Sequence, residues 1–325
     1  MSDREPRRVV LSRRGFLALG SAALATAAGV PLYAWQVEPH WVEVVRRPML
    51  LENLPPALEG RTLLQVSDIH VGPRVSSEYL IDAFDRARAL APDFVVFTGD
   101  FVTYRSADEY RELARVLRHA PNGRIGTVGA LGNHDYGFGW RHIDVADQIS
   151  RVAADAGIRV LRNEIQVIGD LQLAGLTDVW GPEFGAHAVQ SRIVRVLPNG
   201  AKVVGQAPPG GRDAGATLGS LARGLPTIVL AHNPNVQDLP IWDGVRCWSL
   251  AGHTHGGQVK PPFLPPPVLP VKNKRYVAGE YAIGPGRTLY INRGLGHLTQ
   301  VRFNARPEIT LFTLHRAPDN PEEVS

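Results

Sequence analysis

Two histidines separated by one residue, His253 and His255, lie among glycines just after an apolar stretch, Val245 to Ala251. The apolar stretch predicts a buried strand, and side chains two residues apart on extended backbone point to the same side. Flanking glycines let the backbone approach whatever the imidazoles hold. A single pair of this kind is weak evidence for a metal site, because histidine pairs also occur in cores and on surfaces. It therefore indicates a metal site only together with residues upstream.

Further metal-binding side chains follow other apolar stretches of the chain, each at a point where a strand is expected to end. Any one of them alone is explained equally well as a helix cap or a packed histidine, but coincidence does not account for the whole set in this order. Mixed carboxylate, imidazole and amide ligands suit divalent ions such as Mn²⁺, Fe²⁺ or Zn²⁺, and a carboxylate can bridge two ions. The candidate ligands are Asp68, His70, Asp100, Asn133, His232, His253 and His255.

The elements that must position these residues alternate between strand and helix, which predicts an α/β fold with its site outside the carboxyl ends of strands. Apolar spacing predicts helices over 78–90, 109–119, 143–156 and 216–223. Strands are expected at 42–46, 62–66, 94–97, 127–131, 227–230, 245–251, 276–280, 288–291 and 308–314. Three short strands, 159–161, 166–168 and 171–176, are expected to form a meander in a second sheet, and Asn199-Gly200 indicates a hairpin turn.

The ordered set resembles the signature of the calcineurin-like metallophosphoesterases, D-x-H, G-D, G-N-H-D/E, H and G-H-x-H. Its elements here are Asp68-Ile69-His70, Gly99-Asp100, Gly132-Asn133-His134-Asp135, His232 and Gly252-His253-Thr254-His255. No element is missing. The strings 252–258 and 293–296 resemble the bacterial branch that includes twin-arginine-exported and membrane-associated phosphoesterases. The resemblance implies a four-layer α/β/β/α sandwich of two mixed β-sheets flanked by helices.

The resemblance also implies a role for each position. Asp68, His70 and His255 would hold a first ion, with Asp100 as the bridge. Asn133, His232 and His253 would complete the site of a second ion. His134 would act as general acid or phosphate contact, oriented by Asp135. Two such ions would polarise the phosphoryl group and acidify a water, which would attack as hydroxide on a phosphodiester or phosphomonoester.

The N-terminus has the layout of an export signal. Basic residues, including Arg13-Arg14, precede an apolar run from Phe16 to Ala34. The paired arginines resemble the twin-arginine signal of bacteria, which implies recognition by the twin-arginine translocon. An uncleaved membrane anchor is the alternative, because the run is nearly as long as the ~20 residues that a spanning helix needs. We therefore expect a targeting segment at 1–40, a catalytic domain at 41–316 and a disordered tail at 317–325.

Composition narrows the classes of function. The chain has 325 residues, 44% hydrophobic and 20% charged, which is ordinary for a globular protein with a sizeable core. Much of the net charge of +4 comes from the basic N-terminus, so no nucleic-acid partner is expected. A single cysteine, Cys247, excludes an intrachain disulfide and a Cys-rich zinc site.

Export and the resemblance make a cell-envelope substrate plausible, such as a phospholipid or a phosphate-containing wall component. The apolar loop at Phe263-Leu264 is consistent with a lipid-linked substrate and with membrane association. A non-catalytic scaffold on the same fold is the alternative, although such a protein would not need Asp68, Asp100, Asn133 and His134 together. A zinc metalloprotease is disfavoured because the chain has no H-E-x-x-H.

Overall fold

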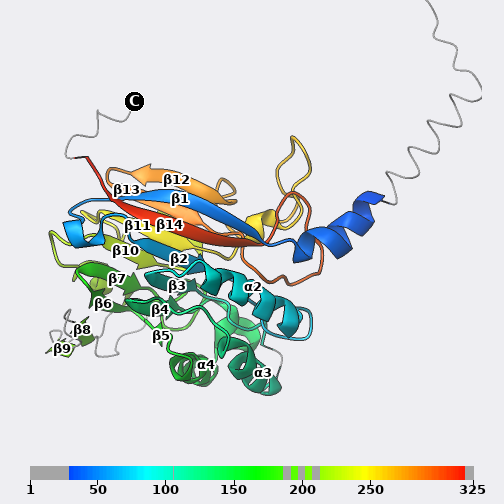
Figure 1. Ribbon diagram of the computed structural model, residues 1–325, viewed down its shortest axis with the longest axis horizontal. Helices are drawn as coiled ribbons and strands as arrows, with labels where there is room; N and C mark the ends of the chain where they lie inside the picture. The colour runs from blue at the N-terminus through cyan, green and yellow to red at the C-terminus, as the bar shows by residue number, and fades with distance from the viewer. Residues whose placement is uncertain (1–28, 105, 186–191, 197–201, 207–212, 319–325) are drawn as a thin grey trace, which may run out of the picture.

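The computed structural model describes residues 29–104, 106–185, 192–196, 202–206 and 213–318 (Figure 1). The paired arginines, most of the apolar run, the turn at Asn199-Gly200 and residues 319–325 of the expected tail lie outside these ranges. The described chain opens with a helical segment from residue 29, which continues as a π-helical turn, η1 (Tyr33–Val37), and a 3₁₀ turn, η2 (Glu38–His40). Within the described ranges, no helix combines the length and the apolar character that crossing a membrane requires.

The first sheet has six strands in the order β1-β14-β2-β3-β4-β5 (Figure 1). The series from β2 to β5 is parallel, whereas β14 runs antiparallel to β2 and parallel to β1. The strands are β1 (Glu43–Leu51), β2 (Thr62–Val66), β3 (Phe94–Thr98), β4 (Gly126–Ala130), β5 (Arg159–Val160) and β14 (Glu308–Arg316). Helices α2 (Ser77–Ala89), α3 (Asp108–Leu117) and α4 (Ile143–Asp155) cover the outer face of this sheet.

The second sheet has eight strands in the order β12-β13-β11-β10-β7-β6-β8-β9. Its centre, β13-β11-β10-β7, is parallel, and β12, β6 and β9 are antiparallel to their neighbours β13, β7 and β8. The strands are β6 (Glu164–Ile168), β7 (Leu171–Gly175), β8 (Arg192–Val196), β9 (Lys202–Gln206), β10 (Thr227–Leu230), β11 (Cys247–Ala251), β12 (Gly279–Gly284) and β13 (Arg287–Ile291). Both sheets are therefore mixed, as expected.

Two layers of apolar side chains hold the sheets and helices together. The inner faces of the two sheets share one cluster, in which Phe94 and Phe312 of the first sheet pack with Leu250 and Tyr290 of the second. A second cluster joins the first sheet to α2, α3 and α4. The outer face of the second sheet is covered more thinly, by α5 (Ala214–Leu218), the 3₁₀ segment η6 (Pro234–Asp238) and their connections. The four-layer sandwich is confirmed, with unequal outer layers.

Some expected elements differ in the structure. The strand at 159–161 does not join a meander in the second sheet, because β5 pairs in parallel with β4 at the edge of the first sheet. The β4-α4-β5 connection is a crossover unit, and such a unit returns the chain to the sheet that it left. Helix α5 begins and ends before the expected 216–223, and the strand expected at 276–280 is β12, which begins only at Gly279. Cys247 is buried in β11, as expected.

The parallel strands determine where polar residues gather. β2, β3 and β4 run in one direction in the first sheet, and β7, β10 and β11 run parallel to one another in the second. The candidate ligands follow the ends of these strands and lie together at one edge of the sandwich, where both sheets contribute.

Candidate metal centre

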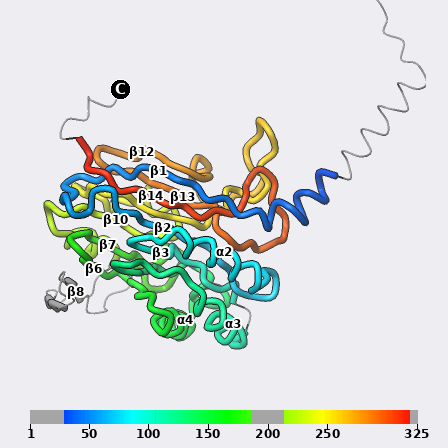
Figure 2. The backbone as a smooth tube through the Cα atoms, in the orientation of Figure 1, coloured from blue at the N-terminus to red at the C-terminus, as the bar shows by residue number. Residues whose placement is uncertain are grey.

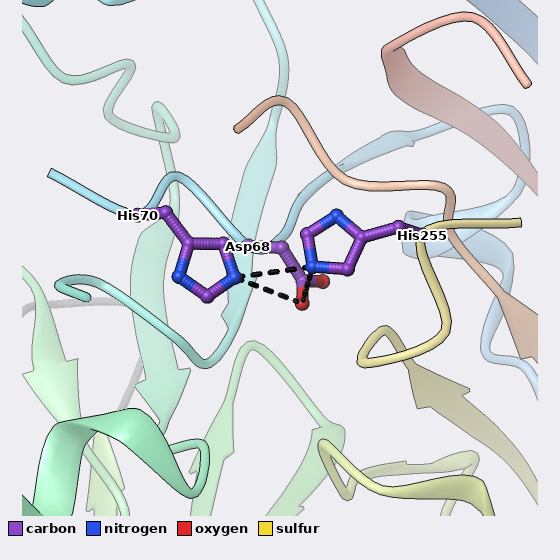
Figure 3. A group of neighbouring side chains, drawn as sticks. All are labelled: Asp68, His70 and His255. Carbon is purple, nitrogen blue, oxygen red and sulfur yellow. Dashed lines mark hydrogen bonds and ion pairs between the residues drawn. The ribbon is translucent and has the colours of Figure 1, made fainter. Parts of the chain in front are cut away.

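Six side chains of the predicted ligand set form two compact groups at this edge. All six are buried, and the ligand atoms of each group lie within 4.8 Å of one another. Figure 3 shows one group, in which two imidazoles and a carboxylate point toward one another. The first triad consists of Asp68, His70 and His255, and the second triad consists of Asp100, His232 and His253.

One carboxylate lies between the two triads. Asp100 Oδ2 is 3.2 Å from His232 Nε2 and 3.5 Å from His70 Nε2, so it faces an imidazole of each triad. Within the first triad, His255 Nε2 is 3.1 Å from His70 Nε2 and 3.4 Å from Asp68 Oδ1. A carboxylate in the position of Asp100 can contact two cations at once, which is the arrangement expected of a bridging ligand.

The backbone that presents these ligands is not extended. The φ angles of Asp68, His70, Asp100, His253 and His255 lie between 47° and 70°, in the left-handed region that L-residues seldom adopt. Alternation along a strand does not explain how the pairs are presented, since β2 and β11 end before their pairs begin. Asp68 and His70 do face one site, as expected, because both belong to the first triad. His253 and His255 instead point to different triads. Strained backbone of this kind is often found at functional sites.

Gly252 allows the second sheet to approach the first triad. A Cβ atom at this position would lie 2.1 Å from both Asp68 Oδ2 and Ser67 Oγ, so a larger residue would displace the carboxylate. The next residue, His253, donates its backbone N–H to the Asp68 carboxylate at 3.1 Å. The two triads are thus connected through the backbone as well as through Asp100.

Hydrogen bonds set the tautomers of the two histidines in the second triad. His232 Nδ1 lies 2.8 Å from the Thr98 carbonyl, and His253 Nε2 lies 2.9 Å from the Pro270 carbonyl. A carbonyl only accepts, so these nitrogens carry the protons. The remaining nitrogens, His232 Nε2 and His253 Nδ1, lie 3.2 Å apart and face the same space. Donation of the far ring nitrogen to a carbonyl is the usual arrangement of a metal-bound histidine.

A further observation supports the fit of these donors to divalent cations. Asn133 is 1% exposed, and its side-chain oxygen has no hydrogen-bond partner among the described residues. A buried acceptor without a donor is costly unless another group, such as a cation, satisfies it. Asn133 directly follows Gly132, which packs on Asp100, so its backbone lies beside the second triad. The residues present would therefore hold two ions, with carboxylate, imidazole and amide donors.

His134 differs from the ligands in being half-buried rather than enclosed. Its backbone N–H donates to Asp100 Oδ1 at 2.9 Å, and its Nδ1 lies 3.2 Å from the Thr103 carbonyl. The Nδ1 proton is therefore held by Thr103, and Nε2 is the nitrogen left for exchange with a substrate. Its ring meets that of His70 edge to face, with centroids 5.1 Å apart. His134 thus lies beside the triads and belongs to neither.

The expected contact between Asp135 and the His134 ring is not what the structure contains. Asp135 accepts three backbone N–H groups instead, from Phe101 at 2.8 Å, Val102 at 3.3 Å and Gly132 at 2.9 Å. It is fully buried behind the site, where it fixes the loops after β3 and β4. The orientation of the His134 ring comes from Thr103, and Asp135 positions the backbone that carries the neighbouring ligands.

The protonation of the site reflects its burial. Burial lowers the pKa of His70 and of His253 to about 3 in the absence of metal, so both imidazoles are neutral near pH 7. Burial raises the pKa of Asp68 to about 6, with the Asp100 carboxylate adding to the effect and His232 opposing it. The pKa of His232 is raised, because Asp100 and Asp68 outweigh the opposing effect of burial. Cation binding would replace the proton that His232 carries.

An aromatic wall, which we define as Trp140 and Trp180, borders the second triad. The two indoles stack with centroids 5.0 Å apart and planes 13° apart. Trp180 meets the His253 ring at 4.6 Å, and Trp140 meets the His134 ring at 5.9 Å. Both indoles are half-buried, so part of each remains available beside the site. The sequence left Trp180 without a role, because no local pattern connects it to residues of a different loop.

The family is decided by comparison with known proteins. Residues 61–265 match the model of the family described as calcineurin-like phosphoesterase, and this range holds all the predicted ligands. The chain belongs to the calcineurin-like phosphoesterase family. The predicted superfamily is thereby confirmed, and with it the expectation of a metal-dependent hydrolase of phosphoric esters.

Relatives of this phosphoesterase cover nearly its whole length. Phosphodiesterase YaeI of Escherichia coli is 32% identical over 316 residues, covering 94% of this chain and 100% of the relative. The protein named uncharacterized metallophosphoesterase YkuE, from Bacillus subtilis, is 31% identical over 317 residues, covering 94% of this chain and 98% of the relative. UDP-2,3-diacylglucosamine pyrophosphatase LpxG of Chlamydia trachomatis is 26% identical over 332 residues, covering 91% and 98%.

The loop that leaves the second triad of this phosphoesterase has both an anchored and an exposed part. It passes from Gln258 through the proline-rich segment to Pro270, whose carbonyl accepts the His253 proton. Phe263 and Leu264, near its tip, are exposed. His297 is buried, and its Nε2 lies 3.0 Å from the Arg74 carbonyl.

Proposed function

We propose that this phosphoesterase uses two divalent ions to hydrolyse a phosphodiester, and that its substrate is a lipid-linked component of the cell envelope. The observation that carries the two-ion proposal is the position of Asp100, whose Oδ2 lies within 3.5 Å of an imidazole from each triad. Asp68, His70 and His255 would hold one ion, and Asn133, His232 and His253 the other. Mn²⁺, Fe²⁺ and Zn²⁺ all suit these donors.

When bound, the ions would supply positive charge that polarises the phosphoryl group and makes a nearby water more acidic. The remaining contribution comes from the chain itself. His134 keeps a proton on Nδ1 through the Thr103 carbonyl, which leaves Nε2 to deliver a proton to the leaving oxygen when the imidazole is charged. Because its backbone N–H binds Asp100, His134 keeps a fixed position relative to both triads.

The apolar surroundings of the site support a substrate with an apolar portion. The aromatic wall borders the second triad, and the exposed Phe138 lies in the same loop as Trp140. Indole rings offer large, rigid apolar surface at little entropic cost. The names of two relatives, a phosphodiesterase and a pyrophosphatase of a diacylated sugar nucleotide, are consistent with a diester and with a lipid-linked substrate.

Export and membrane association are part of the same proposal. The twin arginines Arg13-Arg14 and the apolar run that follows them support passage through the twin-arginine translocon to the outer side of the cytoplasmic membrane. Leu32, Trp35 and Trp41 in the first described segment are exposed, as are Phe263 and Leu264. Apolar side chains in these two segments are suited to contact with a lipid surface. Replacement of both arginines by lysine should retain the protein in the cytoplasm, measured by cell fractionation.

The experiment that tests this proposal compares bis-p-nitrophenyl phosphate with p-nitrophenyl phosphate, using metal-free protein reloaded with Mn²⁺, Fe²⁺ or Zn²⁺. Metal-dependent turnover that favours the diester would support a phosphodiesterase, and preference for the monoester would contradict it. A phosphodiester of diacylglycerol and its deacylated counterpart form the second substrate pair. Equal kcat/KM for these two would remove the support for a lipid-linked substrate. Absence of turnover with both ions bound would favour a non-catalytic scaffold.

Trp180→Ala tests, in the same assay, whether the aromatic wall binds the apolar portion of the substrate. We expect a roughly 3- to 10-fold higher KM for the acylated diester, since contacts of this kind contribute about 0.5–1.5 kcal/mol. The deacylated diester should show little change. Trp242→Phe is the matched control, because Trp242 is a buried tryptophan on the far side of the second sheet.

A further inference from the structure

Arg302 is a fully buried arginine whose guanidinium binds backbone carbonyls. Its Nη1 donates to the Ala305 carbonyl at 2.7 Å. Its Nη2 lies 3.0 Å from the carbonyl of Arg293, 3.1 Å from that of Gly294 and 2.6 Å from that of Gly296. Burying a charged side chain costs free energy. An arginine in this position therefore implies that its hydrogen bonds maintain a conformation on which the protein depends. Four carbonyls around one guanidinium fix the shape of the loop between β13 and β14.

That loop packs directly on the first triad. The backbone N–H groups of Leu295 and Gly296 donate to the carbonyls of Ser67 and Asp68 at 3.0 Å and 2.7 Å. Gly294 has a φ of 70°, and a Cβ atom there would lie 2.6 Å from the Asp68 Cβ. The position of the Asp68 carboxylate therefore depends on the conformation of the residues that Arg302 holds.

The same guanidinium reaches a second ligand of the first triad. Arg302 Nη2 lies 3.4 Å from His255 Nδ1, on the side of the ring that faces away from Asp68. The neighbouring backbone reinforces this contact, because Phe303 N–H donates to the Gln258 carbonyl at 2.8 Å, just beyond the turn that carries His255. Arg302 thus contacts, directly or through one loop, two of the three members of the first triad.

The N-terminal segment is attached to this arrangement from the other side. The Arg302 backbone N–H donates to the Ala34 carbonyl at 2.8 Å. Ala305 N–H donates to Glu38 Oε1 at 2.7 Å, and Glu38 is only 2% exposed. Figure 2 shows the N-terminal helical segment beside the chain that leads into β14. The end of the apolar run, at Ala34, and the residues that follow it, at Glu38, are therefore connected to the support of the first triad.

We propose that Arg302 is a positioning residue that makes the first cation site dependent on docking of the N-terminal segment through Ala34 and Glu38. The inference rests on the proposed two-cation centre. The planar guanidinium meets several carbonyls at fixed angles, which a single ammonium group cannot do. Removal of the guanidinium would leave buried carbonyls without donors, so the loop would rearrange and Asp68 and His255 would lose their positions.

The experiment measures cation binding rather than activity. Metal-free full-length protein is titrated with Mn²⁺ in a calorimeter, and the bound ions are counted by native mass spectrometry. A His232→Ala background weakens the second triad and isolates the first. In that background we expect Arg302→Met to weaken the remaining site by about 10- to 100-fold, the usual effect of removing a residue that supports a metal ligand. Arg302→Lys should also weaken it.

Two controls separate positioning from general damage. Arg111→Met makes the same change in an exposed arginine on α3, which pairs with Asp108 far from the loop, and should leave affinity unchanged. In a His255→Ala background, which isolates the second triad, Arg302→Met should have no effect on affinity. Equal losses at both triads, or unchanged affinity at the first, would overturn the inference. Failure of the wild-type protein to bind any ion would instead refute the two-cation proposal.

Glu38 provides a test that leaves Arg302 in place, and it decides the matter if Arg302→Met does not fold. Glu38→Ala removes the acceptor of Ala305 N–H, whereas the side-chain oxygen of Glu38→Gln can still accept it. We expect Glu38→Ala to lower affinity at the first triad several-fold and Glu38→Gln to resemble the wild type. Equal affinities in the two variants would show that docking of the N-terminal segment does not support the site.

Discussion

The two triads are built from the same residue types, yet their surroundings differ. In the second triad, His232 and His253 each donate one ring proton to a backbone carbonyl, so their other nitrogens are the ones that face the cation site. In the first triad, His70 Nδ1 has no hydrogen-bond partner among the described residues, and His255 Nδ1 faces the guanidinium of Arg302. The imidazoles of the second triad are therefore oriented by carbonyl groups, whereas in the first triad the Nδ1 atoms of His70 and His255 do not meet such an acceptor.

This difference indicates how the site that we propose for two cations is assembled from two sheets. The carbonyls that fix the second triad come from Thr98, at the end of β3, and Pro270, in the loop after β11. The support of the first triad comes from Arg302 and through it from the N-terminal segment. Preorganised ligands bind more tightly because less free energy is lost in ordering them. We therefore expect the second triad to bind its cation first.

The largest effect should come from Asp100, which belongs to the second triad and also faces His70 of the first. Asp100→Asn removes a charge that faces both His70 and His232, so both sites should weaken together. Loss of several kcal/mol of charge stabilisation corresponds to a fall in kcat/KM of about 1000-fold or more. The measurement is diester hydrolysis with bound metal counted in parallel. Asp85→Asn, at an exposed position on α2, is the control. Retention of one tightly bound ion would show that Asp100 serves one triad only.

His134→Ala should separate chemistry from cation binding, because His134 belongs to neither triad. We expect kcat to fall by about 100-fold for a diester with an alkyl leaving group, the lower end of the usual range for general acid catalysis. The fall should be smaller for a p-nitrophenyl ester, since nitrophenolate leaves without being protonated. Both ions should remain bound. Loss of an ion from this variant would place His134 among the ligands.

A smaller effect should show which triad binds its cation first. Titration of metal-free protein with Mn²⁺ should give two steps whose dissociation constants differ by about tenfold or more. Tenfold is the lower end of the change in metal affinity that residues supporting a ligand usually cause. His253→Ala should abolish the tighter step and His255→Ala the weaker one. Calorimetry measures both. If His255→Ala removes the tighter step, the tautomers of the second triad do not govern affinity and the comparison fails.

Much of the fold and the ligand set could be predicted from the sequence because the signals are local. Apolar stretches marked β2, β3, β4, β10 and β11 nearly to the residue, and each is followed closely by metal-binding side chains. Parallel strands bring such residues to one edge of a sheet, whatever the lengths of the connections between them. The two-residue strand β5 was assigned to the wrong sheet, because pairing partners are not encoded in so short a stretch.

The support of the site could not be predicted, because it depends on contacts between distant parts of the chain. Arg302 lies beside His255, and Trp180 beside His253, with no spacing pattern to indicate either contact. Asp135 could be found from its position after His134, but its contacts with backbone N–H groups of the β3 loop could not. Left-handed backbone at Asp68 was also missed, since the alternation of side chains holds only within a strand.

The smallest predicted effect is on the free energy of unfolding at acidic pH, and it should arise from a residue beside the first triad. His297 follows the loop that packs on Asp68, and its Nε2–H donates to the Arg74 carbonyl. Burial, and then the charge of Arg302, lower the pKa of His297 from its ordinary value of 6.5 to about 4. Between these two values the unfolded chain binds a proton that the folded protein excludes, so the free energy of unfolding falls as pH falls through this window.

His297→Gln should remove this contribution while its amide can still donate to Arg74. We expect the pH dependence of the free energy of unfolding between pH 6.5 and pH 4 to become shallower by up to about 1.4 kcal/mol per pH unit. Urea unfolding of metal-free protein at several pH values measures it, and the two proteins are compared by slope so that other titrating groups cancel. Identical slopes would mean that the imidazole is accessible to protons in the folded protein. The loop beside the first triad would then open far more readily than the hydrogen bonds of Arg302 imply, and the contrast between the two triads would be greater still.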